Sequence, residues 1–97
     1  MLRLLEPLVP ERNCLKSRKD GDFLIVTSPS LDIFYLNAVA KDFYLALNRN
    51  KTLAEIRDEF LEQYDVGLKA LSTDLAHLVR DMQWKNIISL KELKNSR

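Results

Sequence analysis

The sequence predicts an α+β fold, in which a three-stranded antiparallel β-sheet is followed by a three-helix unit of the winged helix-turn-helix type. Three observations predict it: apolar residues alternate up to Leu36, the spacing becomes helical at Asn37, and a leucine stripe follows Gly67. The 97 residues are 46% hydrophobic and 30% charged, which is enough for one domain with a modest core.

The chain divides into three parts. Pro7 and Pro10 interrupt the first residues, which predicts an N-terminal lead-in over residues 1–12. The domain itself is predicted to span residues 13–90, and residues 91–97 form a C-terminal tail. No repeat or low-complexity linker divides it further.

The sheet is predicted from two turn signals. "CLKSRK" and "DFLIVTS" flank Asp20-Gly21, a dipeptide that favours the tight turn of a β-hairpin. After the turn at Ser28-Pro29-Ser30, residues 31–36 read as a third strand. Its two faces are both partly apolar, with Leu31, Ile33 and Tyr35 on one and Asp32, Phe34 and Leu36 on the other.

Three helices are predicted after this strand. Asn37 is a favourable N-cap for the first, whose apolar residues are Ala40, Phe43, Tyr44 and Leu47. Thr52 and Glu55 form a capping box at the start of the second, which has the inner stripe Leu53, Ile56, Phe60 and Tyr64. The third ends near Lys85 and carries the stripe Leu68, Leu71, Leu75, Leu78 and Met82. A short closing strand is predicted from Ile87, Ile88 and Leu90.

Composition argues against several classes of protein. The formal net charge is +1, so no bulk charge attracts the chain to nucleic acid or to an anionic membrane. Cys14 is the single cysteine and no apolar run reaches the roughly 18 residues of a membrane span, which together predict a cytoplasmic protein. No nucleophile–base pair, paired catalytic carboxylates or glycine-rich phosphate loop is recognisable, so we expect neither an enzyme nor a cofactor.

The order and spacing of these motifs resemble the pyrroloquinoline-quinone biosynthesis protein D (PqqD) family. The resemblance runs from about Pro10 to Leu90. It includes a strand ending in "LN", a "KTLAEI" helix start, a helix ending in an aromatic residue and a leucine-rich helix closing on "NII". The sequence departs from the family at Asn50 and Asn86, where glycine is common. Asparagine is the residue that best replaces glycine in a left-handed conformation, so these departures weaken the resemblance little.

The resemblance implies that the chain recognises ribosomally made precursor peptides. Such domains bind the leader segment and present the peptide to a modifying enzyme, which is a radical SAM enzyme, a protease or a cyclase. The leader is expected to add as a strand beside residues 31–36 and to lie in the groove between this strand and the third helix. The expected peptide-binding residues are Leu31, Asp32, Ile33, Phe34, Tyr35, Asp74, Leu75, Leu78, Val79 and Met82, with His77, Arg80 and Asp81 as further polar rim.

Other interpretations of the same residues stay open. The leucine stripe is also what a helix core requires, so Leu75, Leu78, Val79 and Met82 are candidates for either groove or core. Trp84 is expected to plug the core, and His77 lacks a second ligand one turn away, so no metal site is expected. A winged-helix DNA-binding regulator is an alternative, although the third helix is nearly neutral. A strand-paired homodimeric adaptor is another, so we expect a monomer or a weak homodimer.

Overall fold

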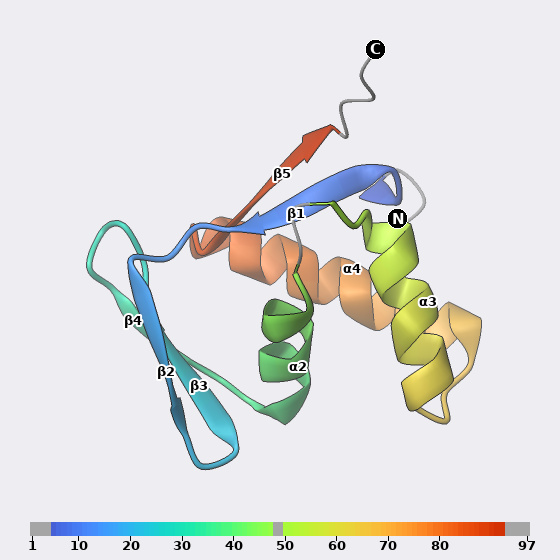
Figure 1. The fold of residues 1–97 in the computed structure, drawn as a ribbon, viewed down its shortest axis with the longest axis horizontal. Coiled ribbons are helices and arrows are strands. Elements are labelled where there is room, and N and C mark those ends of the chain that lie inside the picture. Colours follow the sequence, from blue (N-terminus) through green and yellow to red (C-terminus); the bar gives the residue numbers. More distant parts are fainter. Residues whose placement is uncertain (1–4, 48–49, 93–97) are drawn as a thin grey trace.

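The computed structural model describes residues 5–47 and 50–92 and confirms the α+β class (Figure 1). Within these residues it contains a three-stranded antiparallel sheet, a separate two-stranded ribbon and three helices. The elements in chain order are β1 (Leu8–Arg12), β2 (Lys16–Asp20), β3 (Phe23–Thr27), β4 (Ile33–Leu36), α2 (Ala38–Ala46), α3 (Leu53–Gln63), α4 (Leu68–Trp84) and β5 (Ile88–Glu92).

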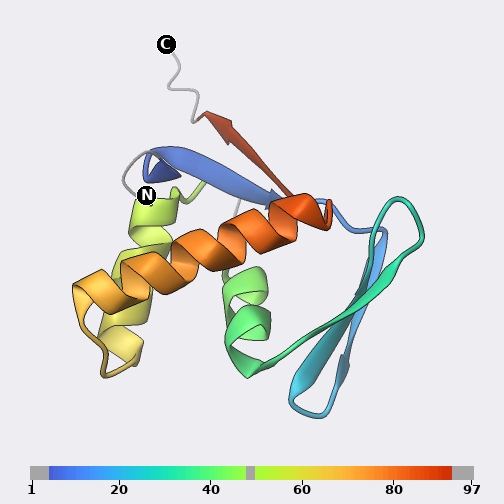
Figure 2. The ribbon, with the colours of Figure 1, turned by 180° about the vertical axis from the view of Figure 1, so that it is seen from behind.

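The helices pack against both sheets. In Figure 1 the β2–β3–β4 sheet is at the left, the β1–β5 ribbon runs over the top, and α4 crosses behind α2 and α3. Figure 2 shows α4 from the opposite side, in front of the other two helices. One apolar core joins all three helices to the inner faces of both sheets, and its largest fully buried side chains include Phe43, Tyr44 and Ile56.

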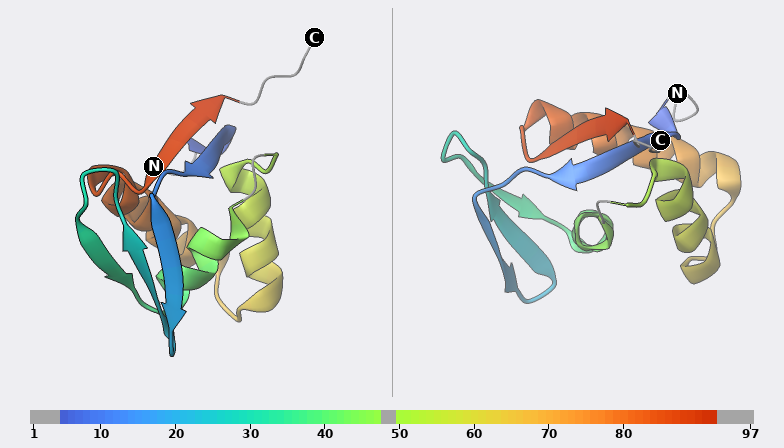
Figure 3. Two further views of the ribbon diagram at one scale, coloured as in Figure 1. Left: turned by 60° about the vertical axis from the view of Figure 1, so that its left-hand side comes forward. Right: turned by 45° about the horizontal axis from the view of Figure 1, so that its top comes forward.

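The predicted hairpin is present as β2 and β3, which are seen beside β4 in the left view of Figure 3. Gly21 adopts a φ of 62°, the left-handed conformation that the tight turn requires. Leu24 and Val26 of β3 point into the core, whereas every residue of β2 is exposed. The hairpin therefore covers one side of the helices with β3 and presents β2 to solvent.

Strand β4 begins two residues later than predicted. Leu31 adopts a φ of 72°, which a bulky residue rarely does, and it cannot continue a strand. The buried hydroxyl of Ser28 accepts hydrogen bonds from the N–H groups of Ser30 (3.2 Å) and Asp32 (3.1 Å). These bonds close a tight turn, so the regular strand starts at Ile33 and the prediction of a strand from Leu31 was wrong.

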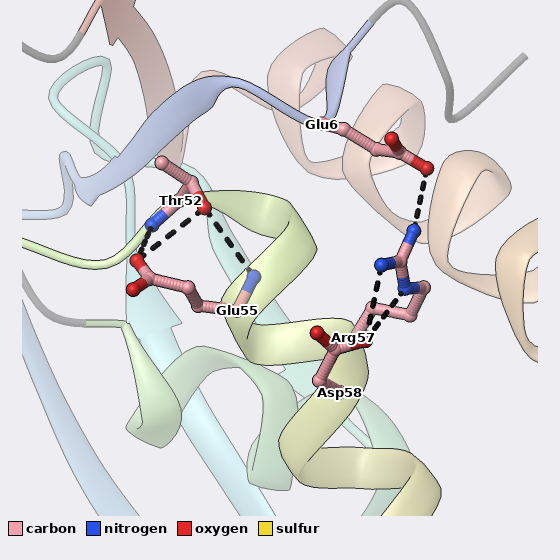
Figure 4. Close-up of polar contacts among 5 residues, drawn as sticks. All are labelled: Glu6, Thr52, Glu55, Arg57 and Asp58. Atoms are coloured by element: carbon pink, nitrogen blue, oxygen red, sulfur yellow. Dashed lines mark hydrogen bonds and ion pairs between the residues drawn. The ribbon is translucent and has the colours of Figure 1, made fainter.

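The strand-to-helix junction at Asn37 is confirmed. The side-chain oxygen of Asn37 accepts a hydrogen bond from the N–H of Ala40 at 3.0 Å. The next helix, α3, begins with the predicted capping box, in which Thr52 and Glu55 each bond the other's backbone N–H (Figure 4). Such caps satisfy N–H groups that the first turn of a helix leaves free.

Helix α4 ends in a Schellman motif. The N–H of Asn86 donates to Gln83 and the N–H of Ile87 donates to Met82, while Asn86 has a φ of 60°. Asparagine therefore performs the role that glycine often has at this position. Trp84 is 86% exposed, so the expectation that it plugs the core was wrong.

Residues 8–12, which were predicted as part of a lead-in, form strand β1. This strand pairs antiparallel with β5, from Leu8 opposite Glu92 to Arg12 opposite Ile88, and Val9 is fully buried. Just before β1, the carboxylate of Glu6 forms an ion pair with Arg57 of α3 (Figure 4). Residues 1–4 of the predicted lead-in and 93–97 of the predicted tail lie outside the described residues; residues 91 and 92 belong to β5.

We expect removal of residues 1–12 to lower the free energy of unfolding by about 4 kcal/mol or more. The truncated chain would lose about four ladder hydrogen bonds and the burial of Val9, at about 0.5–1.5 kcal/mol per bond and about 1.5–3 kcal/mol for the side chain. Urea unfolding, monitored by circular dichroism, measures the free energy of unfolding of the full and truncated chains. A truncated chain with an unchanged transition would support the original interpretation of a separate lead-in.

Candidate functional site

Strand β4 lies at the edge of its sheet. It pairs with β3 on one side, and no strand within residues 5–47 and 50–92 pairs with its other side. An edge strand presents backbone N–H and C=O groups with which another chain can pair. An extended peptide can therefore add to the sheet here.

The register shows which backbone groups of β4 are open. The N–H of Ser28 donates to the carbonyl of Asp32 at 2.8 Å, so this opposed pair is hydrogen-bonded. Hydrogen-bonded and non-hydrogen-bonded pairs alternate along an antiparallel ladder. The pairs that Ile33 and Tyr35 make with β3 are therefore of the non-hydrogen-bonded kind. The N–H and C=O groups of these two residues consequently point away from β3, toward the open edge.

The side chains of β4 alternate between solvent and the helices. Ile33 and Tyr35 are 62% and 63% exposed, and the ring of Tyr35 makes an edge-to-face contact with Phe23, 6.4 Å between centroids. Phe34 points to the other side and is half-buried, with the ammonium group of Lys85 5.2 Å from its ring centroid. The end of α4 therefore lies beside β4.

An apolar cavity of 450 Å³ adjoins the end of β4 and lies between α2, α3 and α4. Asn37, the residue directly after β4, forms part of its wall, so the cavity begins where the open edge ends. The remaining lining residues are Val39, Ala40, Phe60, Tyr64, Val66, Leu71, Asp74, Leu75, His77, Leu78 and Asp81.

Aromatic packing holds the inner wall of the cavity in place. The rings of Phe60 and Tyr64 are 5.2 Å apart, and Phe60 also packs edge-to-face on Phe43 in the core. The hydroxyl of Tyr64 donates to the carboxylate of Asp42 on α2. This hydrogen bond, together with burial, raises the pKa of Tyr64, so the phenol stays neutral at physiological pH. The wall is therefore an uncharged, supported surface.

The rim of the cavity is acidic. Asp74 and Asp81 are exposed on one face of α4, and the lining includes no lysine or arginine. Asp81 forms an ion pair with Lys85, whose ammonium group lies 2.9 Å away. Asp74 forms no ion pair within the described part of the chain. The free negative charge at the rim is therefore centred on Asp74.

Two kinds of site are not found in the described part of the chain. It contains no group of three or more histidine, cysteine, aspartate or glutamate residues arranged to hold a metal ion. None of its helices is both long enough and apolar enough to cross a membrane.

A family model for coenzyme PQQ synthesis protein D (PqqD) matches residues 24–88. The chain belongs to the PqqD family. The match runs from β3 to the start of β5 and so includes β4 and every residue that lines the cavity. No curated protein matches the sequence.

The structure is also similar to that of TbiB1 in complex with the TbiA(beta) leader peptide. The TM-score is 0.68 at 21% sequence identity, and the alignment covers 87% of this chain and 91% of that chain. The similarity shows that this PqqD-family chain and TbiB1 share a fold.

The predicted site residues occupy three different environments in this PqqD fold. Leu31 and Asp32 are in the exposed turn before β4, and Ile33, Phe34 and Tyr35 form most of the strand. Asp74, Leu75 and Leu78 line the cavity, as do the rim candidates His77 and Asp81, but Arg80 does not. Val79 and Met82 are 0% and 1% exposed and pack in the core, away from the lining.

Seven of the twelve residues that line the cavity, among them Leu71 of α4, were not assigned to the site by the sequence analysis. Asn37, Val39 and Ala40 come from the start of α2, and Phe60, Tyr64 and Val66 come from the end of α3 and the loop after it. The local signal in the sequence was Val66, an apolar residue that stands between Asp65 and Gly67 where the chain turns. Asn37 was recognised only as a helix cap, and the remaining residues have the pattern of ordinary helix residues.

We expect Met82→Ala and Leu78→Ala to differ in their effect on stability. Met82 is enclosed, so its truncation leaves a void and lowers the free energy of unfolding by about 2–5 kcal/mol. Leu78 is half-buried at the open cavity, where water can fill the space, so the loss is smaller. Chemical denaturation of the two variants and the wild-type chain measures the two losses in the free energy of unfolding. An equal loss for Leu78→Ala would show that this residue belongs to a closed core.

Proposed function

We propose that this chain binds the leader segment of a ribosomally synthesised precursor peptide by strand addition to β4. The observation that carries the proposal is the open edge of Ile33 and Tyr35, which runs into an apolar cavity. Membership of the PqqD family supports it, as does the shared fold with TbiB1, whose structure contains a leader peptide. The bound peptide would lie along β4 and beside α4.

The open edge alone gives too little free energy for stable binding. About four ladder hydrogen bonds contribute roughly 2–6 kcal/mol in total. Association costs about 4 kcal/mol or more in lost translational and rotational freedom. Two or three buried apolar side chains of the peptide, at about 1.5–3 kcal/mol each, would bring the affinity toward the micromolar range. The cavity beside β4 supplies a place for such side chains.

In this proposal the chain binds and presents the peptide, and a partner enzyme performs the chemistry. The partner is a peptide-modifying enzyme, for which a radical SAM enzyme, a protease and a cyclase are the candidates. The complex would form in the cytoplasm without nucleic acid or membrane. The same open edge can pair with a second copy of the chain, so a weak homodimer would compete with peptide binding.

We expect Tyr35→Pro to weaken binding of the leader by at least about tenfold, which is equivalent to about 1.4 kcal/mol. Proline removes an N–H that points to the open edge, and such a position tolerates proline because β3 does not use that donor. Calorimetric titration with the leader of a precursor peptide encoded beside the gene measures the loss. The circular dichroism spectrum of the Tyr35→Pro variant should remain that of the wild-type chain.

Phe34→Pro is the matched control for this experiment. The N–H of Phe34 points toward β3, so proline at this position breaks the ladder within the sheet. We expect Phe34→Pro to lower the free energy of unfolding, unlike Tyr35→Pro. Wild-type affinity in a natively folded Tyr35→Pro variant would mean that the edge of β4 is not the binding surface.

A further inference from the structure

We propose that the cavity beside β4 selects leader peptides in which a bulky, uncharged apolar residue has a lysine or arginine next to it. This inference rests on the proposed function, because it specifies the peptides that the same site accepts. Three features carry it: the position of the cavity, the polarity of its wall and the charge of its rim.

The position of the cavity fixes where the apolar residue lies in the peptide. β4 has four residues, and Asn37 of the cavity wall follows the last of them directly. At about 3.3 Å per residue, a peptide paired with β4 moves from the open edge to the cavity within one to three residues. The selected residue is therefore just outside the paired segment, at the end that lies beside Leu36.

The wall of the cavity selects for an apolar side chain. The volume of the cavity, 450 Å³, is within the range of about 300–1,000 Å³ that ligand pockets usually have. Phe60, Leu71 and Leu75 are buried and supply an apolar floor. A charged group placed against this floor would lose its hydration, which is unfavourable, because the carboxylates that could pair with a cation are at the rim. A large aliphatic or aromatic side chain gains the most from this site.

The rim selects the neighbouring residue. Asp74 and Asp81 are four residues before and three residues after Leu78, so on a helix all three lie on one face with the leucine between the two carboxylates. A peptide side chain that covers Leu78 therefore has a carboxylate on either side. Lys85 partly neutralises Asp81, which leaves Asp74 as the stronger attraction for a cation. An acidic residue beside the apolar anchor would be repelled.

The inference is tested with a phage-displayed library of random twelve-residue peptides, selected on the purified full chain. We expect enriched peptides to contain a leucine, isoleucine, methionine, phenylalanine, tyrosine or tryptophan with an adjacent lysine or arginine. Changing that basic residue to glutamate in a synthetic copy of an enriched peptide should weaken binding about threefold to tenfold, as expected for two exposed charges. The difference should shrink below about twofold in Asp74→Asn/Asp81→Asn and persist in the control Glu62→Gln.

A second pair of variants tests whether the cavity is the place of contact. Val66 and Leu68 are both exposed apolar residues, 46% and 54% exposed, near the start of α4, but only Val66 lines the cavity. We expect Val66→Arg to weaken binding of an enriched peptide by about tenfold or more, because it adds a cation at the rim and obstructs the entrance. Leu68→Arg adds the same charge two residues away and should change binding less than about twofold.

The outcomes separate this inference from the proposed function. Enriched peptides that bind, that lose affinity with Tyr35→Pro, and that show no apolar-basic preference would overturn the inference and leave strand addition standing. Peptides that keep the preference and respond to Val66→Arg but not to Tyr35→Pro would overturn strand addition and leave the cavity as the recognition site. Failure to enrich any peptide would overturn both.

Discussion

The junction at Asn37 determines how the open edge of β4 and the apolar cavity lie relative to each other. Its side-chain oxygen accepts the N–H of Ala40, so β4 ends and α2 begins within one residue. No loop separates the two elements, and Phe43 and Tyr44 of α2 are buried in the core. The edge and the cavity are therefore held as one surface, which would favour the proposed peptide binding because little ordering of the chain would be required.

The two parts of this surface serve different purposes. In the proposed complex, backbone groups of Ile33 and Tyr35 would pair with any extended peptide, because every residue except proline carries the same N–H and C=O groups. The cavity and its acidic rim would contact side chains, so in this proposal they distinguish one peptide from another. In the proposed complex the first part would align the peptide, and the second would add most of the affinity and the selectivity. Neither would suffice alone, since ladder hydrogen bonds barely offset the cost of association.

Local signals in the sequence predicted most of the fold. The Asn37 cap, the Thr52–Glu55 capping box and the Asp20-Gly21 turn each depend on neighbouring residues, and all three are present. Strand β1 was missed because its partner β5 is about 80 residues away in the chain, and because a proline in such a short strand hides its pattern.

The site was harder to predict because helical periodicity defines a face but not what covers it. Leu78 and Met82 belong to the same stripe of α4, yet Leu78 borders the cavity and Met82 is enclosed. The other wall comes from α2 and α3, including Val39 and Tyr64, and only the packing of three helices brings these residues together. The open edge of β4 was predicted, and the later strand that the sequence predicted at Ile87, Ile88 and Leu90 leaves this edge free because it pairs with β1.

Amide hydrogen exchange measured by NMR, with and without the leader peptide, tests the central claim most directly. In the free chain, the amide hydrogens of Ile33 and Tyr35 should exchange quickly, whereas that of Phe34 should be protected by its bond to β3. Saturating peptide should protect Ile33 and Tyr35 and leave Phe34 as it was. Peptide binding that protects other amides while Ile33 and Tyr35 continue to exchange quickly would contradict strand addition to β4.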